Sequence, residues 1–348
     1  MSTDTSSDQD RATQAAARDV PARVRGPLRR GVSRALGQDE SGVLAVLVTL
    51  VVVVSLFHGD FLEVASISGT LRQTAFIAIM AFGMVFLVTM RDFDLSVGGN
   101  YGFCVMLAAS VMAEGVQPWL AAALAVVAGV GLGVVNGLIA EGLRVPVIIV
   151  TLGTLSMYRG LAELVTGGEP VSGLPLESSF FTTLGRDVGF LPAAAIVMAL
   201  LCAALTLVYR RTRFGAQVRA IGSNPAAARL AGVRISAVRI ATLALIGAMV
   251  GVAAVLTLAY FGTADPTQGS GYELYVIAAV VIGATPLSGG RGTVIGALLG
   301  AMIIQVIQSG LVFFGVGAQW STFATGAVIV AAVAFDNILR RRSEQRQA

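Results

Sequence analysis

The most restrictive feature of this sequence is a long stretch without a charged side chain near its C-terminal end. No Asp, Glu, Lys or Arg occurs from Gly292 to Phe335. A helix needs about 20 apolar residues to cross a bilayer, so this stretch is long enough for two crossings. Only 13% of the residues are charged and the mean hydropathy is +0.80, whereas roughly a quarter of the residues are charged in a soluble domain. An all-α polytopic membrane protein is therefore expected.

Uncharged stretches predict about ten transmembrane helices between two polar tails. Residues 1–40 are expected to form a disordered N-terminal tail, residues 41–338 the transmembrane domain, and residues 339–348 a C-terminal tail. The predicted spans lie near residues 41–57, 73–90, 95–113, 116–140, 145–166, 188–209, 240–262, 274–287, 293–314 and 319–336.

The distribution of arginine predicts how these spans are oriented. If the N-terminus lies in the cytoplasm, only Arg72, Arg159 and Arg186 fall in or near outward-facing segments. Cytoplasmic loops retain positive charge, so both termini are expected in the cytoplasm of a multi-pass protein of the cytoplasmic membrane. Residues 210–239 then form the largest cytoplasmic loop, and this loop is rich in arginine.

The chain contains no lysine, and this absence excludes one kind of chemistry. A phosphate-binding loop of the Walker A type requires a lysine that reaches the phosphates. Any ATP must therefore be hydrolysed by a separate subunit, and the chain itself is not expected to be an enzyme. Cys104 and Cys202 lie in apolar stretches, and His58 is the only histidine. Neither a metal site nor a cofactor is expected.

Inside the loop, a short helix is predicted from Pro225 to Ala231. Asn224 or Ser223 can cap this helix, and Pro225 is favourable in its first turn. The alanines and glycines of this helix leave a flat surface that another protein can approach closely. Arg219 and Arg229 could pair with acidic side chains on that partner. A basic loop that only obeys the orientation rule is the alternative. The residues of the predicted docking surface are Arg219, Asn224, Pro225, Ala227, Ala228, Arg229 and Gly232.

Four motifs carry a resemblance to a known family. They are RFGAQVRAIGSNPAAARLAGV at 213–233, FDLSVGG at 93–99, VPVIIVTLGTLSMYRGLAELVTGGEPV at 145–171 and GSGYELYVIAAVVIGATPLSGGRGTVIGALLGA at 269–301. In their order and spacing, the chain resembles the ribose-type permeases of ATP-binding-cassette importers over about residues 42–338. The resemblance implies a type II-like importer permease that passes a monosaccharide by alternating access, with the short cytoplasmic helix seated in a cleft of the ATPase.

The resemblance also implies partners. These are separate ATPase subunits, a second permease copy in a homodimer or heterodimer, and an extracytoplasmic sugar-binding protein. Membrane lipids are expected to surround the protein, and no nucleic acid is expected to bind.

The chain departs from the family pattern at several points near the predicted pathway. Relatives commonly carry an acid where this chain has Tyr275, and they often have glycines where it has Arg91, Asp92 and Phe93. A permease for nucleosides or branched-chain amino acids is therefore an alternative. A stand-alone secondary transporter is a further alternative, but it would be expected to bury coupling charges at the midplane, where this chain has few.

The segment after the second span predicts part of a polar pathway. Gly98 and Gly99 allow a chain break at membrane depth, and such a break must line a cavity or be buried in protein. Asp94, Ser96 and Asn100 would then face the pathway. Alternatively, Asp94 only caps the next helix, whose N-terminal end favours negative charge.

Hydroxyl and acidic side chains in later spans extend the predicted pathway. Thr151, Thr154 and Ser156 are suited to weak contacts with a sugar, although small residues in such a helix also serve tight packing. Tyr272 and Glu273 lie at the mouth of a later span. Three roles are open for Glu273: an ion pair with Arg159, a gate, or contact with the binding protein.

Overall fold

The computed structural model describes residues 38–317, 320, 323 and 326–327. The chain divides into two compact units, Met1–Ser41 and Gly42–Ala348, and almost all of the described residues belong to the second unit. The predicted C-terminal tail lies outside the described residues. So do the predicted N-terminal tail, except for residues 38–40, and the predicted span at 319–336, except for residues 320, 323 and 326–327.

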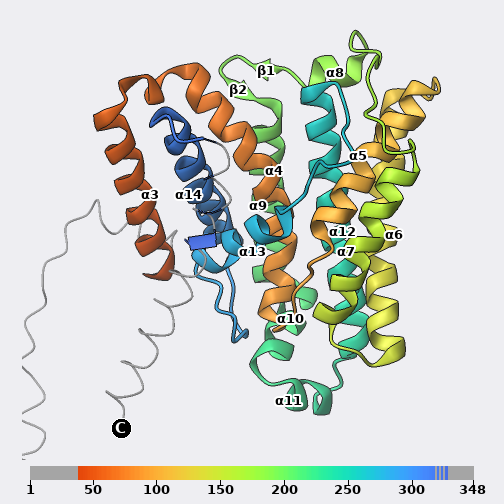
Figure 1. Cartoon of the computed structure of the whole chain (residues 1–348). Helices are drawn as coiled ribbons and strands as arrows, with labels where there is room; N and C mark the ends of the chain where they lie inside the picture. The colour runs from red at the N-terminus through yellow and green to blue at the C-terminus, as the bar shows by residue number, and fades with distance from the viewer. Residues whose placement is uncertain (1–37, 318–319, 321–322, 324–325, 328–348) are drawn as a thin grey trace, which may run out of the picture. The chain divides into compact units, whose positions relative to one another are not determined.

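The described chain consists of helices and one short hairpin (Figure 1). The α-helices are α3 (Gln38–Phe57), α4 (Val64–Thr89), α5 (Val97–Ala113), α6 (Pro118–Leu143), α7 (Val147–Leu164), α8 (Ser179–Leu184), α9 (Ala193–Arg211), α10 (Arg213–Ser223), α11 (Pro225–Leu230), α12 (Ile235–Phe261), α13 (Tyr272–Ile282) and α14 (Val294–Phe313), with a 3-10 helix at Gly59–Leu62. The antiparallel hairpin pairs β1 (Asp187–Val188) with β2 (Leu191–Pro192).

The expected all-α polytopic architecture is confirmed. Within the described residues, seven helices are long and apolar enough to cross a membrane: α3, α4, α6, α7, α9, α12 and α14. The prediction of about ten spans is only approximate, because α5 and α13 are shorter apolar helices. In Figure 1, α8 and the hairpin lie at one end of the bundle, and α10 and α11 lie at the other.

Several predicted spans have different boundaries in the structure. The span expected at 73–90 begins at Val64, and Arg72, just before the predicted start, pairs with Asp187 of the hairpin. The span expected at 188–209 begins only at Ala193, since the hairpin occupies its first residues. The span expected at 274–287 is α13, which ends before Gly283. With 11 residues, α13 is about 16 Å long and cannot cross a hydrocarbon core of about 30 Å.

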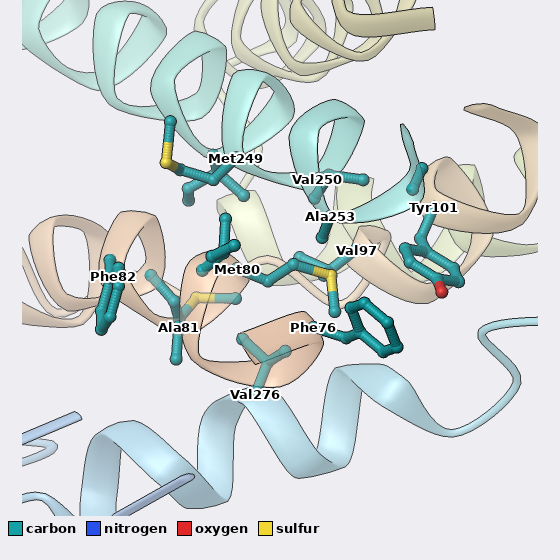
Figure 2. Close-up of a cluster of buried hydrophobic side chains, with 14 of the residues drawn as sticks. Phe76, Met80, Ala81, Phe82, Val97, Tyr101, Met249, Val250, Ala253 and Val276 are labelled. Carbon is teal, nitrogen blue, oxygen red and sulfur yellow. The ribbon is translucent and has the colours of Figure 1, made fainter. Parts of the chain in front are cut away.

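Helix α4 lies at the centre of the hydrophobic core. Its side chains from Thr74 to Thr89 are all buried, and it packs against α9, α12, α13 and α14. Figure 2 shows Phe76, Met80 and Phe82 of this helix gathered with side chains of α5, α12 and α13. This part of α4 is covered by protein on all sides and has no face for lipid, whereas Val64 and Ile67 near the start of the helix are exposed.

Helices α6 and α12 approach so closely that their contact requires glycine. Gly129, Gly133 and Gly137 follow one another at intervals of four residues on α6, and so share one face. A Cβ atom at Gly133 would lie 2.2 Å from the carbonyl oxygen of Leu243, and one at Gly247 would lie 2.0 Å from that of Gly129. Small residues of this spacing allow two membrane helices to pack backbone against backbone.

This packing yields a matched pair of variants. Gly133→Leu should prevent the approach of α6 to α12, and the detergent-solubilised protein should aggregate or melt at a clearly lower temperature. Gly131→Leu lies on the same helix with no atom within 4 Å of its added Cβ, so it should behave like the wild type. Fluorescence-detected gel filtration after heating to a series of temperatures measures aggregation and the melting temperature of each variant. Equal loss in the two variants would mean that added bulk alone, rather than the α6–α12 contact, causes the effect.

Candidate functional site

Helix α5 begins inside the bundle rather than at its end. Its N-cap residue, Ser96, accepts a hydrogen bond from the Asn136 amide nitrogen at 2.8 Å. Asn136 precedes the end of α6 at Leu143 by seven residues, which corresponds to about 10 Å along the helix. Residues 90–96 therefore turn back from the end of α4 into the bundle, and we call them the first connector.

A second connector, residues 262–271, enters the bundle from the opposite end. It follows α12 and leads into the first turn of α13. A Cβ at Gly102 would lie 2.8 Å from the carbonyl oxygen of Gln268, and one at Gly98 would lie 2.6 Å from that of Gly269. The backbone of this connector is therefore packed against α5.

The predicted break at Gly98 and Gly99 is displaced in the structure. Both glycines lie in the first turn of α5, and the non-helical residues precede them. Their lack of a side chain is required for another reason. A Cβ at Gly99 would lie 2.6 Å from the carbonyl oxygen of Leu155, and Gly98 faces the second connector. These glycines allow close approach of three segments rather than a break in the helix.

Asp94 forms a buried hydrogen-bonded chain at the start of α5. Its Oδ1 atom accepts hydrogen bonds from the backbone nitrogen of Ser96 at 2.8 Å and from the Ser96 hydroxyl at 2.6 Å. Asn136 donates to Ser96, and the Tyr158 hydroxyl donates to Asn136 Oδ1 at 2.8 Å. The carboxylate thus stabilises the turn before α5 and lies near the helix end that favours negative charge.

Three more residues of the predicted pathway lie around this chain. Thr151 accepts a hydrogen bond from the backbone nitrogen of Leu95 at 3.1 Å, which ties the first connector to α7. Thr154 donates to the carbonyl oxygen of Thr151, and Asn100 donates to that of Gly129. All of these polar groups are buried. They belong to one site, and protein groups provide their hydrogen bonds.

Ser156 lies apart from this site. It is on the exposed face of α7, together with Gly153, which has no atom within 4 Å of an added Cβ. Gly153 and Ser156 therefore do not serve tight packing inside the chain, whereas Thr151 and Thr154 are buried. The helical period places Ser156 on a different face from Thr154, which is two residues earlier. Which of the two faces is covered depends on the neighbouring helices.

Glu273 and Arg159 form the ion pair that the sequence left open. Arg159 Nη2 lies 3.2 Å from Glu273 Oε1 and joins α7 to the first turn of α13. The neighbouring Tyr272 ring lies 5.1 Å from the ring of Tyr101, measured between centroids. Glu163, four residues after Arg159, is exposed. The pair therefore connects two segments that are far apart in the sequence.

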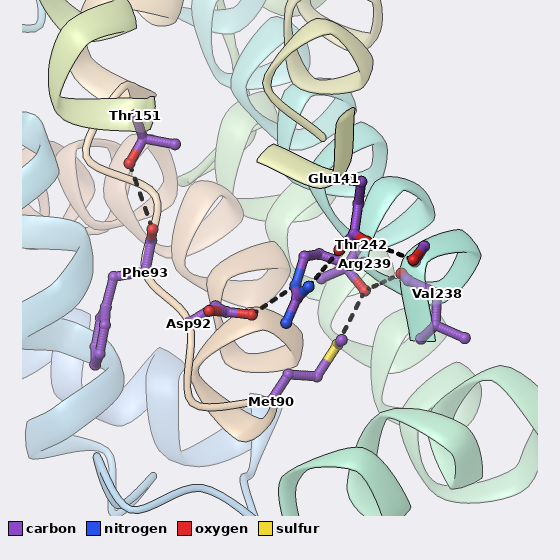
Figure 3. Close-up of polar contacts among 9 residues, drawn as sticks. Met90, Asp92, Phe93, Glu141, Thr151, Val238, Arg239 and Thr242 are labelled. Atoms are coloured by element: carbon purple, nitrogen blue, oxygen red, sulfur yellow. Dashed lines mark hydrogen bonds and ion pairs between the residues drawn. The ribbon is translucent and has the colours of Figure 1, made fainter. Parts of the chain in front are cut away.

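An ionic network that the sequence did not predict lies where α6 and α12 approach the first connector. Arg239 pairs with Asp92 at 2.8 Å and also with Glu141, which accepts a further hydrogen bond from Ser236 (Figure 3). Burial raises the pKa of Asp92, while the positive charge of Arg239 acts in the opposite direction. The only sequence signal is a pair of acids at the ends of apolar stretches close to a basic loop.

The arginine-rich loop folds into two helices. The predicted helix is α11: Asn224 Oδ1 accepts a hydrogen bond from the backbone nitrogen of Ala227 at 3.1 Å, Pro225 begins the helix, and Gly232 follows it with a φ of 83°. Helix α10 was not predicted. Its signals are the cap at Thr212 and the apolar residues that it buries, which follow a helical spacing.

The predicted docking residues divide into two groups. Arg219 donates to the carbonyl oxygen of Tyr209 and lies over its ring, 5.1 Å from the centroid, so its charge is used inside the chain. Ala228 is buried. Exposed residues form the free side of α11 and the turn that follows: Asn224, Pro225, Ala227, Arg229, Leu230 and Gly232. The Leu230 side chain is 91% exposed.

Arg91 joins this loop to the first connector. Its Nε atom donates to the carbonyl oxygen of Gly222 at 2.8 Å, and Nη2 donates to that of Ser223 at 3.2 Å. These carbonyls end α10, where a positive charge is favourable. Arg91 holds a φ of 70°, a conformation that is unfavourable for a side-chain-bearing residue. The two hydrogen bonds offset this strain and tie the loop to the segment that carries Asp94.

Comparison with known proteins extends these observations. A family model described as branched-chain amino acid transport system / permease component matches residues 66–333. The ribose import permease of Escherichia coli K12 is 34% identical over 312 residues, which cover 89% of this chain and 97% of that protein. The ribose import permease of Bacillus subtilis is 37% identical over 83% of this chain and 90% of its own length.

A third relative has a different named substrate. The autoinducer 2 import system permease of Yersinia enterocolitica is 32% identical over 86% of this chain and 83% of its own length. No solved structure matches the chain significantly. These matches confirm the resemblance that the four motifs predicted.

The ionic network predicts a specific pattern of stability. Arg239→Met should leave two acidic side chains close together without their counter-charge, and should lower the free energy of unfolding by about 2 kcal/mol. Adding Asp92→Asn and Glu141→Gln should restore most of that stability, since a neutral set needs no counter-charge. Arg234→Met, at an exposed arginine near the start of α12, is the control. Thermal melts compare the wild type, Arg239→Met, the triple variant and Arg234→Met. A triple variant that is no more stable than Arg239→Met would contradict this interpretation.

Proposed function

The chain belongs to the family described as branched-chain amino acid transport system / permease component, and from this premise we propose that it is the transmembrane permease subunit of an ATP-binding-cassette importer for a monosaccharide. The likeness to two ribose import permeases over most of the chain carries this proposal. It is a multi-pass membrane protein, with seven described helices suited to span a bilayer. The proposed orientation places both termini in the cytoplasm.

The site supports a route for coupling transport to ATP hydrolysis in a separate subunit. The exposed side of α11 is the proposed surface for that ATPase, with Arg229 and Leu230 as its most prominent side chains. From there, Arg91 connects the end of α10 to the first connector, whose residue Asp94 holds the start of α5. A movement of the loop would therefore reach the buried polar site through the Arg91 side chain and the backbone of the first connector.

The proposed pathway runs beside the start of α5. The hydroxyl and carboxylate groups at this site are buried and hydrogen-bonded within the chain, so contact with a neutral polyol requires this site to open during transport. The chain makes no covalent change to its substrate. A second copy of the permease is the proposed partner for the exposed face of α7, where Ser156 lies. The end of the bundle that carries α8 and the hairpin, opposite α10 and α11, is the proposed surface for an extracytoplasmic sugar-binding protein. Nucleosides and branched-chain amino acids remain the alternative substrates.

Uptake by the native host tests the transport function directly. Deletion of the gene should abolish ATP-dependent uptake of one labelled monosaccharide from a panel that includes D-ribose, and a plasmid copy should restore it. Uptake of uridine and L-leucine should not change. Loss of uridine or leucine uptake, with all sugars still imported, would instead assign the permease to that substrate class.

The docking surface makes a separate prediction about the ATPase. Leu230→Glu replaces an exposed apolar side chain by a charge without affecting the buried face of α11. The permease should still reach the membrane but should recover at least about tenfold less ATPase on affinity purification. A carboxylate buried at an interface without a counter-charge is strongly unfavourable, and a loss of about 1.4 kcal/mol already corresponds to tenfold. Val188→Glu, 62% exposed in the hairpin at the other end of the bundle, is the matched control. ATPase recovery that falls equally in both variants, or in neither, would contradict docking at α11.

A further inference from the structure

An open cavity of about 300 Å³ lies between the start of α4, the end of α12 and the end of α14. Arg72, which lines it, pairs with Asp187, so the cavity is at the same end of the bundle as the hairpin (Figure 1). Ligand sites in proteins commonly have volumes of about 300 Å³ or more. The cavity is therefore large enough for a small molecule, and it shares no lining residue with the buried site at the start of α5.

The polar groups of this cavity are accessible, in contrast to those of the buried site. Four uncharged polar side chains line it, and all four residues are partly exposed: Ser66, Thr70, Gln73 and Ser309. Thr70 and Ser309 share a hydrogen bond of 3.2 Å that joins α4 to α14. Ser66 and Gln73 form no side-chain hydrogen bond with another described residue. Their hydroxyl and amide groups can therefore bind a ligand without breaking a contact inside the chain.

Tyr260 forms an aromatic wall of the cavity, and Arg72 fixes this wall in place. The guanidinium carbon of Arg72 lies 4.1 Å from the centroid of the Tyr260 ring. The same guanidinium pairs with Asp187 and donates to the Ser68 hydroxyl at 3.4 Å. Tyr260 is nevertheless 40% exposed, so part of it remains for a ligand. A ring that is already held in position loses little conformational entropy when a ligand packs against it.

The charges around the cavity favour a neutral ligand. Arg72 is the only charged residue among the described residues that line it, and its charge is balanced by Asp187. Its side chain is only 12% exposed, so a lipid phosphate would have to compete with Asp187 for the guanidinium. A sugar is uncharged and combines hydroxyl groups with C–H groups that can pack against an aromatic ring. The cavity offers partners for both, as binding sites for small molecules commonly do.

The cavity also lies where the second connector begins. Tyr260 is two residues before this connector, which lies against Gly98 and Gly102 of α5. In the proposed orientation this end of the bundle faces outward, toward the sugar-binding protein. A sugar held in the cavity would thus be at the start of a segment that leads to the buried polar site.

We propose that this cavity is an entrance site of the permease, which holds a monosaccharide before the sugar reaches the buried polar site. The Tyr260 ring packs against C–H groups of the sugar, and Ser66 and Gln73 form hydrogen bonds with its hydroxyl groups. The pair of Arg72 and Asp187 stays intact and holds the aromatic wall. This assignment rests on the proposed function, since it names residues that recognise the transported sugar.

Saturation-transfer NMR on the purified permease in lipid nanodiscs tests the site, with D-ribose, D-xylose and D-galactose as separate probes. The wild type should bind at least one of these sugars. Gly69 lines the cavity, and an added Cβ there has no atom within 4 Å. Gly69→Phe should therefore be accommodated while its ring occupies the cavity, and the sugar signal should be lost. Gly131→Phe, at a glycine of α6 that has equal space, should bind as the wild type does.

Substitutions of Tyr260 separate recognition from folding. Tyr260→Phe keeps the ring and its contact with Arg72, so it should bind the sugar as the wild type does. Tyr260→Leu removes the ring and should weaken binding by about tenfold. Phe261→Leu, at the adjacent aromatic residue that does not line the cavity, is the matched control. A purely structural role of Tyr260 would lower the melting temperature of Tyr260→Leu but leave its sugar binding unchanged.

Several results would overturn the proposal. If the wild type binds none of the three sugars, or if Gly69→Phe and Gly131→Phe lose binding equally, the cavity is not a sugar site. Native mass spectrometry that finds a phospholipid on the wild type but not on Gly69→Phe, without any sugar signal, would assign the cavity to a lipid. If Gly69→Phe restores full uptake to the deletion strain, the cavity is not an entrance. Restoration of uptake by the wild-type gene decides independently whether the transport function stands.

Discussion

A bilayer provides no hydrogen-bond partners for a free peptide group, and the arrangement of this chain depends on that constraint. Residues 90–96 and 262–271 leave helical geometry inside the bundle, which is possible only where protein surrounds them. The second connector pairs through Ala264 with Val171 and lies against Gly98 and Gly102 of α5. Because these glycines carry no side chains, the connectors can pack against helix backbone, and the short helices α5 and α13 can begin where they do.

The polar groups of the site gather at the starts of these two helices. Asp94 precedes α5, and Glu273 lies in the first turn of α13. The N-terminal end of a helix favours negative charge, so each acid occupies a place where its burial is less unfavourable. Arg91 of the first connector donates to a carbonyl at the end of α10, and Arg239 of α12 pairs with Asp92 of the same connector. The same few residues thus stabilise the irregular backbone and connect the loop to the interior.

Much of the candidate site could be predicted from the sequence, but the use of its residues could not. A cap at the start of α11 was predicted, and Asn224 provides it. The pairing of Arg159 with Glu273 was one of three roles left open, and it is present. Arg219 was expected to face a partner and instead contacts Tyr209. Arginine placement indicates the side of a membrane on which a loop lies, but it contains no information about which neighbour a guanidinium meets.

The sequence by itself determined the membrane-spanning character, most of the helices, the absence of a phosphate-binding lysine and the short capped helix. These features follow from composition and from residues close together along the chain, where length, polarity and capping act locally. Only the tertiary structure decided the depth at which α5 and α13 begin, the roles of Gly98 and Gly99, and the network around Arg239. Those features depend on contacts between segments such as Gly98 and Gly269, whose approach is set by the packing of the whole bundle.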